Sequence, residues 1–226
     1  LMHMPEKKPR SLRLLVLTLV GFSLSAFTVI LLIIFYTAMP QMLLQSENRY
    51  LDKQMEGVEG LLDMSMHGTY VMADDIGIWD ETVHFVQGDN PDYLSSNWPD
   101  VSMLRAYRFN FVVIRDLDGK VRHQEFLDYV NDRPMAEPEG FVRYLDKISN
   151  EVLDMYKQPH DPNAPVEELG KGGILFYNQA PYFVAAMPIM TSRGAGSPAG
   201  TVIMGSILDN QYFRHLTHYE TLKFEV

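Results

Sequence analysis

The stretch LLVLTLVGFSLSAFTVILLIIFY, residues 14–36, carries no charged side chain and decides how the rest of the chain is organised. As a helix it would reach roughly 35 Å, against a bilayer hydrocarbon core of about 30 Å. A lone segment can satisfy its backbone polar groups in lipid only as a helix. We therefore predict a transmembrane helix over residues 14–38. A cleavable signal peptide is the alternative, but its apolar region would be only about 7–15 residues long.

Basic residues lie on one side of this segment. Four of them precede it: Lys7, Lys8, Arg10 and Arg13. No charged residue follows the segment before Glu47. Because positively charged flanks stay in the cytoplasm, residues 1–13 should be cytoplasmic and the chain beyond about Met39 should lie outside. The expected location is a bacterial inner (cytoplasmic) membrane, crossed once here, with a periplasmic or extracellular domain.

The outside portion is acidic and lacks cysteine. The chain has 29 acidic and 19 basic residues. Of these, 28 acidic and 15 basic residues follow residue 38, so this portion has a net charge of −13. A surface of that sign repels phosphate backbones, which argues against a nucleic-acid partner. With no cysteine, the domain is not held together by disulfides. Its length is sufficient for one domain with its own core.

Residues beyond the membrane segment recur at the spacing of a coiled coil. Intervals of four and three residues separate Leu44, Asn48, Leu51, Met55, Val58, Leu62 and Ser65. This pattern predicts a helical stalk over residues 41–72 that pairs with a second copy in a homodimer, with Asn48 at a position that can set the register. The alternative is an amphipathic helix that packs on its own domain.

Helices and hairpin-linked strands are expected over the remaining chain. Strands are predicted at residues 109–116, 120–128, 173–178, 182–190 and 201–208. Helices are predicted at residues 74–86, after Asn90 and Pro91, from Pro138 through Val152, and after a cap at Asp209. Residues 157–170 read as a loop. Because most of the strands are joined by hairpins, the fold class is α+β: one antiparallel sheet of PAS-like or Cache-like kind, with helices packed on it.

Two sequence blocks carry a family resemblance. The first is Asp-Asp-x3-Trp-Asp-Glu-Thr-x2-Phe-Val at residues 74–86, and the second is Gly-Thr-Val-Ile-Met-Gly-x2-Leu-Asp at residues 200–209. With the preceding anchor, the chain over about residues 45–226 resembles the fourth subtype of CHASE domain, an extracellular sensory domain of cyclases and histidine kinases. The family often has a basic residue at the position of Ser206, so we assign Ser206 no role.

Five residues are candidate ligand contacts: Trp79, Asp80, Asn110, Tyr177 and Tyr182. An aromatic ring beside a carboxylate, as at Trp79 and Asp80, can hold a small polar ligand by stacking and charge-assisted hydrogen bonds. The tyrosines and Asn110 could add hydroxyl and amide groups. The alternative places Trp79 in the core, with Asp80 as a helix cap or paired with an arginine.

Metal and cofactor sites find little support. His215 and His218 could share a helix face, but no third or fourth zinc ligand accompanies them. Asp116, Asp118 and Gly119 resemble a calcium loop, yet Leu127 stands where the terminal glutamate belongs, so a hairpin turn is expected. We therefore predict no metal and no cofactor. We also predict no catalytic residue, since cysteine and the Gly-x-Ser-x-Gly motif of serine nucleophiles are both absent.

The resemblance implies a signal-input region without enzymatic activity of its own, flanked by two membrane spans. It would bind a small extracytoplasmic ligand and signal to a diguanylate cyclase, a phosphodiesterase or a histidine kinase. The alternating pattern of residues 221–226 reads as an unfinished strand, so we expect the output region to follow Val226. The alternatives are a membrane-tethered binding or assembly protein without output, and a tethered hydrolase that uses Asp80.

Overall fold

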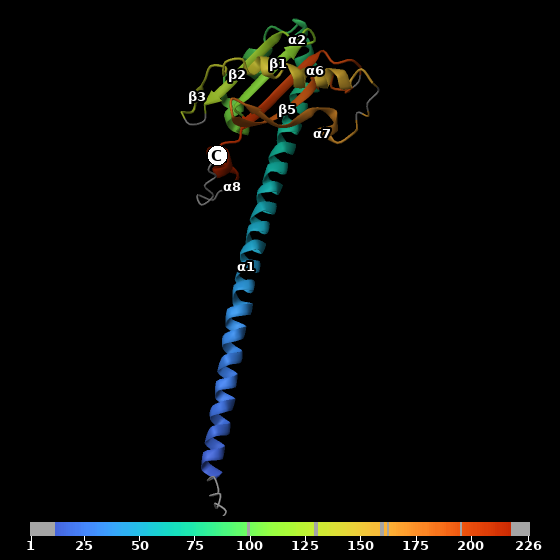
Figure 1. Cartoon of the computed structure of the whole chain (residues 1–226). Helices are drawn as coiled ribbons and strands as arrows, with labels where there is room; N and C mark the ends of the chain where they lie inside the picture. The colour runs from blue at the N-terminus through green and yellow to red at the C-terminus, as the bar shows by residue number, and fades with distance from the viewer. Residues whose placement is uncertain are drawn as a thin grey trace, which may run out of the picture. The chain divides into compact units, whose positions relative to one another are not determined.

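The chain forms two compact units, one ending at Gly57 and one beginning at Val58, and helix α1 (Leu12–Gly77) contributes to both. This computed structural model describes residues 12–98, 100–128, 131–158, 161, 163–194 and 196–217, without the side chains at 38, 40–48, 51 and 214–217. Figure 1 shows the elements and labels most of them.

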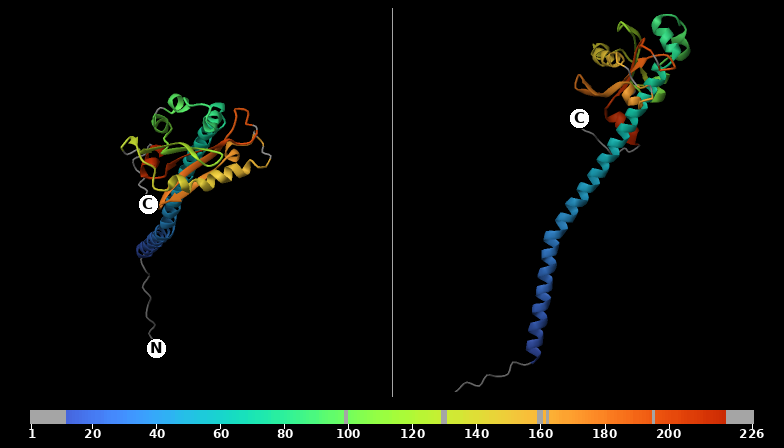
Figure 2. Two further views of the ribbon diagram at one scale, coloured as in Figure 1. Left: turned by 90° about the horizontal axis from the view of Figure 1, so that it is seen from above. Right: turned by 90° about the vertical axis from the view of Figure 1, so that its right-hand side faces the viewer.

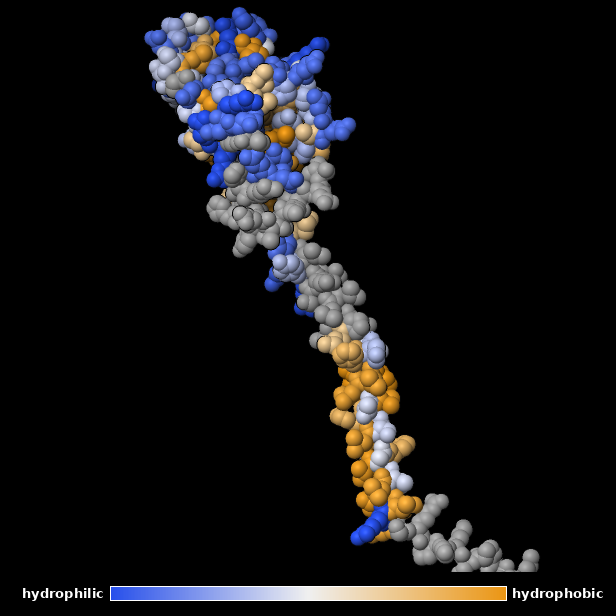
Figure 3. All heavy atoms as spheres, turned by 90° about the vertical axis from the view of Figure 1, so that its left-hand side faces the viewer, coloured by the Kyte–Doolittle hydropathy of each residue, from blue (hydrophilic) through white to orange (hydrophobic). Residues whose placement is uncertain are grey.

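The first unit contains the apolar part of α1. Over Leu12–Thr37 the helix is long and apolar enough to cross a membrane, and none of its side chains is buried inside the protein. Its hydrophobic surface is orange in Figure 3. A helix with apolar side chains on every face is stable when lipid surrounds it. The helix predicted at residues 14–38 is therefore present and could span a bilayer.

Within its described residues, the second unit contains one antiparallel sheet, the end of α1 and seven further helices. Its strands are β1 (Phe111–Asp116), β2 (Val121–Asp128), β3 (Arg133–Pro134), β4 (Lys171–Tyr177), β5 (Ala180–Ile189) and β6 (Gly200–Ile207). After the end of α1 come α2 (Asp80–Gln87), α3 (Tyr93–Asn97), α4 (Ser102–Tyr107), α5 (Phe141–Tyr144), α6 (Asp146–Met155), α7 (Val166–Leu169) and α8 (Asn210–Thr217). The sheet order is β3-β2-β1-β6-β5-β4, which confirms the α+β class. The sequence did not predict β3, α4 or α7.

Two tight turns form the predicted hairpins. In the β1–β2 turn, Asp116 Oδ1 accepts the backbone N–H groups of Asp118 at 3.1 Å and Lys120 at 2.9 Å, and Gly119 adopts φ +78°. The β4–β5 turn places Asn178 at φ +48° and Gln179 at φ +68°. Two consecutive left-handed residues match the right-handed twist of the flanking strands.

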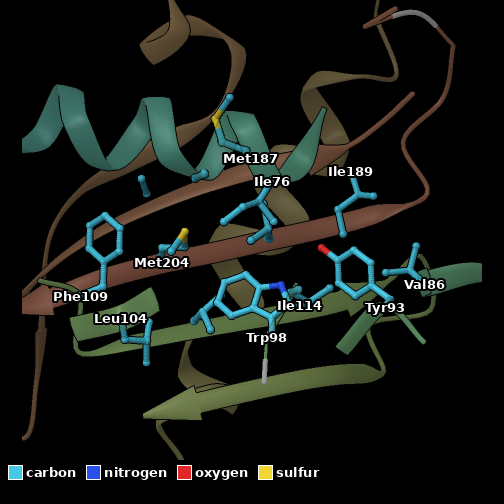
Figure 4. Close-up of a cluster of buried hydrophobic side chains, with 14 of the residues drawn as sticks. Ile76, Val86, Tyr93, Trp98, Leu104, Phe109, Ile114, Met187, Ile189 and Met204 are labelled. Carbon is cyan, nitrogen blue, oxygen red and sulfur yellow. The ribbon is translucent and has the colours of Figure 1, made fainter. Parts of the chain in front are cut away.

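The sheet separates two buried clusters. Facing helices α1–α4, one face presents Val112, Ile114, Met187, Ile189 and Met204, several of which are visible in Figure 4. Facing α5 and α6, the other presents Phe111, Val113, Phe126, Val184 and Ile203. Figure 2 shows α6 and the last part of α1 on opposite sides of the sheet. Alternate strand residues point to opposite faces, so each central strand supplies both clusters.

The long helix ends at Gly77, so the prediction of continuous helix over residues 74–86 is wrong. A Cβ at Gly77 would lie 2.5 Å from the Pro188 carbonyl oxygen, and the Gly77 carbonyl accepts the Met190 N–H at 2.9 Å. Ile78 forms a parallel bridge with Met190. The chain therefore leaves the helix to pair with the sheet, and α2 begins as a new helix.

Helix α3 begins later than Asn90 and Pro91 predict. Its first residue is Tyr93, and Asp92 precedes it. The Asn90 side chain donates to Glu81 Oε2, so it joins α2 to the α3 turn and does not cap a helix. The local pattern marked a turn correctly but placed the helix start incorrectly.

The predicted stalk residues differ in their surroundings. The side chains of Leu44, Asn48 and Leu51 lie outside the described residues. Met55 is 61% exposed, while Val58 and Leu62 are partly buried. The Ser65 hydroxyl is hydrogen-bonded to Tyr212 of the same chain, so the last position of the predicted seam faces its own domain. Pairing of the stalk with a second copy stays a prediction.

Candidate functional site

A cavity of about 330 Å³ lies where β1 begins, β2 and β6 end, and α8 starts. Its apolar and aromatic lining consists of Tyr107, Phe109, Leu127, Met135, Ile207 and Tyr212. Its polar lining consists of Ser65, Arg108, Asn110, Asp128, Ser206, Asp209 and Gln211. An apolar cavity of this size with several convergent polar groups is typical of a small-molecule site.

Arg108 has an unusual backbone at the edge of the cavity. It adopts φ +62° where α4 ends, and its N–H is directed to the carbonyls of Leu104 and Arg105. The Ser206 hydroxyl donates to the Arg108 carbonyl at 2.8 Å. A left-handed conformation is costly for a residue with a side chain and persists where its surroundings hold it. Ser206, which has no recognisable sequence signal, is one of the groups that hold it.

Asn110 joins three strands at the cavity wall. Its Nδ2 donates to the Leu127 carbonyl at 3.1 Å, and its Oδ1 accepts the Ile207 N–H at 2.9 Å. Its backbone N–H donates to the Gly205 carbonyl at 2.9 Å. The Asn110 side chain therefore joins the ends of β2 and β6 to the segment before β1. It holds the cavity wall in place and also presents a polar group to the cavity.

Tyr212 connects α8 to α1. Its hydroxyl is hydrogen-bonded to that of Ser65, and its backbone N–H donates to Asp209 Oδ1 at 2.8 Å. Burial raises the pKa of the Tyr212 phenol above its usual value, although the hydrogen bond to Ser65 acts in the opposite direction. Asp209 also accepts the Gln211 N–H at 2.9 Å, as the predicted helix cap requires.

Trp79 and Asp80 are not among the residues that line the cavity. The Trp79 ring is partly buried, 5.9 Å from Tyr93, whose hydroxyl is hydrogen-bonded to Thr82 at 2.8 Å. Asp80 Oδ1 accepts the Ser192 N–H at 3.0 Å, and the Asp80 N–H donates to Ser192 Oγ at 3.3 Å. These contacts join the start of α2 to the segment after β5. Trp79 packs against the core, as that alternative predicts. Asp80 is the first residue of α2, and its carboxylate accepts from Ser192 instead of capping the helix.

Tyr177 and Tyr182 lie on the α5 side of the sheet. Their rings are 5.1 and 4.7 Å from the ring of Phe141, and the Tyr177 hydroxyl donates to the Glu139 carbonyl. Of the five candidate ligand contacts, only Asn110 lines the cavity. The structure thus places the five residues in three different regions, and a ligand-binding role for each stays a prediction.

Potential metal ligands are dispersed in the described part of the chain. No group of three or more His, Cys, Asp or Glu side chains there could hold a metal ion. The side chains of His215 and His218 lie outside the described residues. Asp116 is used within the hairpin, where its Oδ2 accepts from Arg122 Nε at 2.7 Å.

Comparison with known proteins is consistent with this architecture. One relative is the methanogenesis regulatory histidine kinase FilI of Methanothrix harundinacea (strain 6Ac), which is 24% identical over 163 residues. The aligned segment covers 72% of this chain and 17% of that kinase. The CHASE4 domain family matches residues 62–226, which include the whole sheet and the cavity. Since this match covers most of the chain, the protein belongs to the CHASE4 family of extracellular sensory domains.

Proposed function

We propose that the sensory domain binds a small ligand in the cavity at α8 and signals through α1 and α8. The observation that carries this proposal is the position of the cavity. Its lining includes Ser65 on α1 and Tyr212 on α8, and these two residues are hydrogen-bonded to each other. A ligand that binds one arrangement of these helices more tightly than another shifts the population toward that arrangement.

In the proposed topology the cavity lies outside the cytoplasm. The four basic residues before the apolar segment favour a cytoplasmic N-terminus in an inner membrane. The acidic domain would then lie on the other side and meet extracytoplasmic ligands. A homodimer is proposed through the part of α1 that precedes Ser65, because Ser65 itself contacts α8 of its own chain.

Loss of the Tyr212 hydroxyl should loosen α8. A hydrogen bond contributes about 1 kcal/mol, so Tyr212→Phe should speed amide exchange in α8 roughly fivefold. Hydrogen exchange of the 226-residue chain in lipid nanodiscs would measure this. The matched control is Tyr107→Phe, because Tyr107 also lines the cavity but its side chain is 52% exposed. Equal exchange in both variants would contradict a link between α1 and α8 at this position.

The output of the proposed signalling protein is a histidine kinase, with a diguanylate cyclase or phosphodiesterase as alternatives. The relative FilI is a histidine kinase of which this chain matches only 17%, which leaves ample length for an output region there. We expect the reading frame beyond Val226 to encode a second apolar span of about 20 residues and then a kinase or cyclase signature. Sequencing the gene would test this, and a stop codon directly after Val226 would overturn the signalling proposal.

A further inference from the structure

We infer that the cavity binds a small organic cation, an ammonium group carried on an apolar body. This inference rests on the proposed sensory function of the same cavity, and it adds the chemical class of the ligand. It is drawn from the charges, aromatic rings and hydrogen bonds of the lining residues.

Two carboxylates in the lining are held in place by N–H donors. Asp209 Oδ1 accepts the backbone N–H groups of Gln211 and Tyr212 at 2.9 and 2.8 Å. Asp128 accepts from Asn131 through both oxygens, at 3.2 and 2.7 Å. Among the described residues, the side-chain hydrogen bonds of Asp209 all use Oδ1, which leaves Oδ2 for a ligand. A carboxylate fixed in this way offers a preorganised negative charge to a cation.

Three aromatic side chains accompany the carboxylates. Tyr107, Phe109 and Tyr212 line the cavity, and the rings of Tyr107 and Phe109 are nearly parallel, with centroids 6.4 Å apart. Aromatic rings attract cations through their negative faces, and aromatic groups beside a carboxylate are typical of sites that recognise ammonium ligands. The apolar remainder of the lining suits the body of such a molecule.

The charge balance of the lining also favours a cation over an anion. Arg108 is the one basic residue among the cavity-lining residues described, against two carboxylates. Arg133, outside the lining, has its Nε 3.9 Å from Asp128 Oδ2, so Asp209 is the carboxylate on which the inference mainly depends. The portion of the chain after residue 38 has a net charge of −13, which raises the local concentration of cations. An anionic ligand would have to approach both carboxylates against this field.

A matched series of three probes tests the head group. Phenethylammonium, 2-phenylethanol and 3-phenylpropionate share one apolar body and differ in charge. We expect calorimetric titration of the chain in zwitterionic nanodiscs to show phenethylammonium binding about tenfold more tightly than the alcohol, with the carboxylate weakest.

A conservative variant separates charge from structure. Asp209→Asn keeps an oxygen that can accept the two backbone N–H groups and removes the negative charge. It should weaken phenethylammonium binding about tenfold and leave the affinity for 2-phenylethanol unchanged. Asp128→Asn should also weaken the binding of phenethylammonium. Asp100→Asn is the control, because Asp100 Oδ1 also accepts a backbone N–H, that of Ser102 at 2.7 Å, beside the start of α4 and away from the cavity.

The outcomes distinguish the ligand class from the site. Two results would show that the ligand is not a cation. One is that the alcohol or the carboxylate binds as tightly as the ammonium, and the other is that Asp209→Asn and Asp128→Asn leave the ratio of ammonium to alcohol affinity unchanged. In both cases the cavity remains the proposed sensory site. If none of the three probes binds, the proposed use of this cavity as the sensory site is overturned together with the ligand class.

Discussion

Replacing Phe141 with alanine should lower the free energy of unfolding of the domain by about 3–5 kcal/mol. Phe141 is fully buried, and its ring lies 5.0 Å from Phe111 and 4.7 Å from Tyr182. It anchors α5 on the sheet, so its loss leaves a cavity between the helix and two strands. Chemical denaturation followed by far-UV circular dichroism would measure the change.

Phe176→Ala is the matched control for this prediction. Phe176 lies on β4 and its side chain is 66% exposed, so its removal should change the free energy of unfolding by less than about 0.5 kcal/mol. A Phe141→Ala variant as stable as Phe176→Ala would contradict the packing of α5 on the sheet. The comparison also excludes a general effect of losing an aromatic ring.

Acidification from pH 6.5 to 4 should destabilise the domain, and His123 should account for much of the effect. The His123 ring lies 5.5 Å from the buried Trp98, and burial lowers the pKa of His123 from 6.5 to about 4. Between these values the unfolded chain binds a proton that the folded domain does not. The free energy of unfolding therefore falls as the pH falls from 6.5, and the loss is complete below about pH 4.

Two partly buried carboxyl groups act in the opposite direction. Burial raises the pKa of Glu125, with a further contribution from Asp100, and burial with the charge of Asp75 raises the pKa of Asp74. The stability that these groups contribute is present at low pH and is lost as the pH rises through their raised pKa values. For His123 itself, we expect the free energy of unfolding to fall by roughly 2 kcal/mol between pH 6.5 and 4, with partial screening by solvent included.

His123→Gln removes the histidine together with its 3.7 Å contact between His123 Nε2 and Glu125 Oε1, and leaves Asp74 in place. Its free energy of unfolding, measured by urea denaturation at several pH values, should fall much less between pH 6.5 and 4 than that of the parent protein. His84→Gln is the control, because the His84 side chain is 56% exposed. If His123→Gln and the parent protein had the same pH dependence, the histidine would not be buried in its neutral form.

Local sequence patterns predicted the elements whose formation depends on neighbouring residues. The uncharged run over residues 14–36 predicted the apolar helix, because lipid contact requires apolar side chains on every face. One helix was predicted from Pro138 through Val152; the structure has the two helices α5 and α6 there, with Phe141 and Val152 buried. Asp209 was predicted as a helix cap, and its carboxylate accepts the N–H groups of the first turn. The block containing Trp79 and Asp80 identified the family.

The same patterns were less informative where distant segments meet. The end of α1 at Gly77 depends on the approach of Pro188 and Met190, which are more than a hundred positions later in the sequence. Likewise, Trp79 and Asp80 resembled a binding pair, yet they contact Tyr93 and Ser192. A residue type that suits ligand binding also suits core packing and hydrogen bonds within the fold, and the sequence pattern does not distinguish these uses.

By itself, the sequence determined the apolar helix, the antiparallel α+β class and the family, since each depends on side-chain periodicity or on a contiguous block of residues. The tertiary structure alone decided where the cavity lies. Its wall combines Ser65, residues 107–110, the end of β2 and residues 206–212, which come together only after the sheet has paired in its register. Long-range strand pairing brings these segments together, and no local spacing in the sequence encodes their proximity.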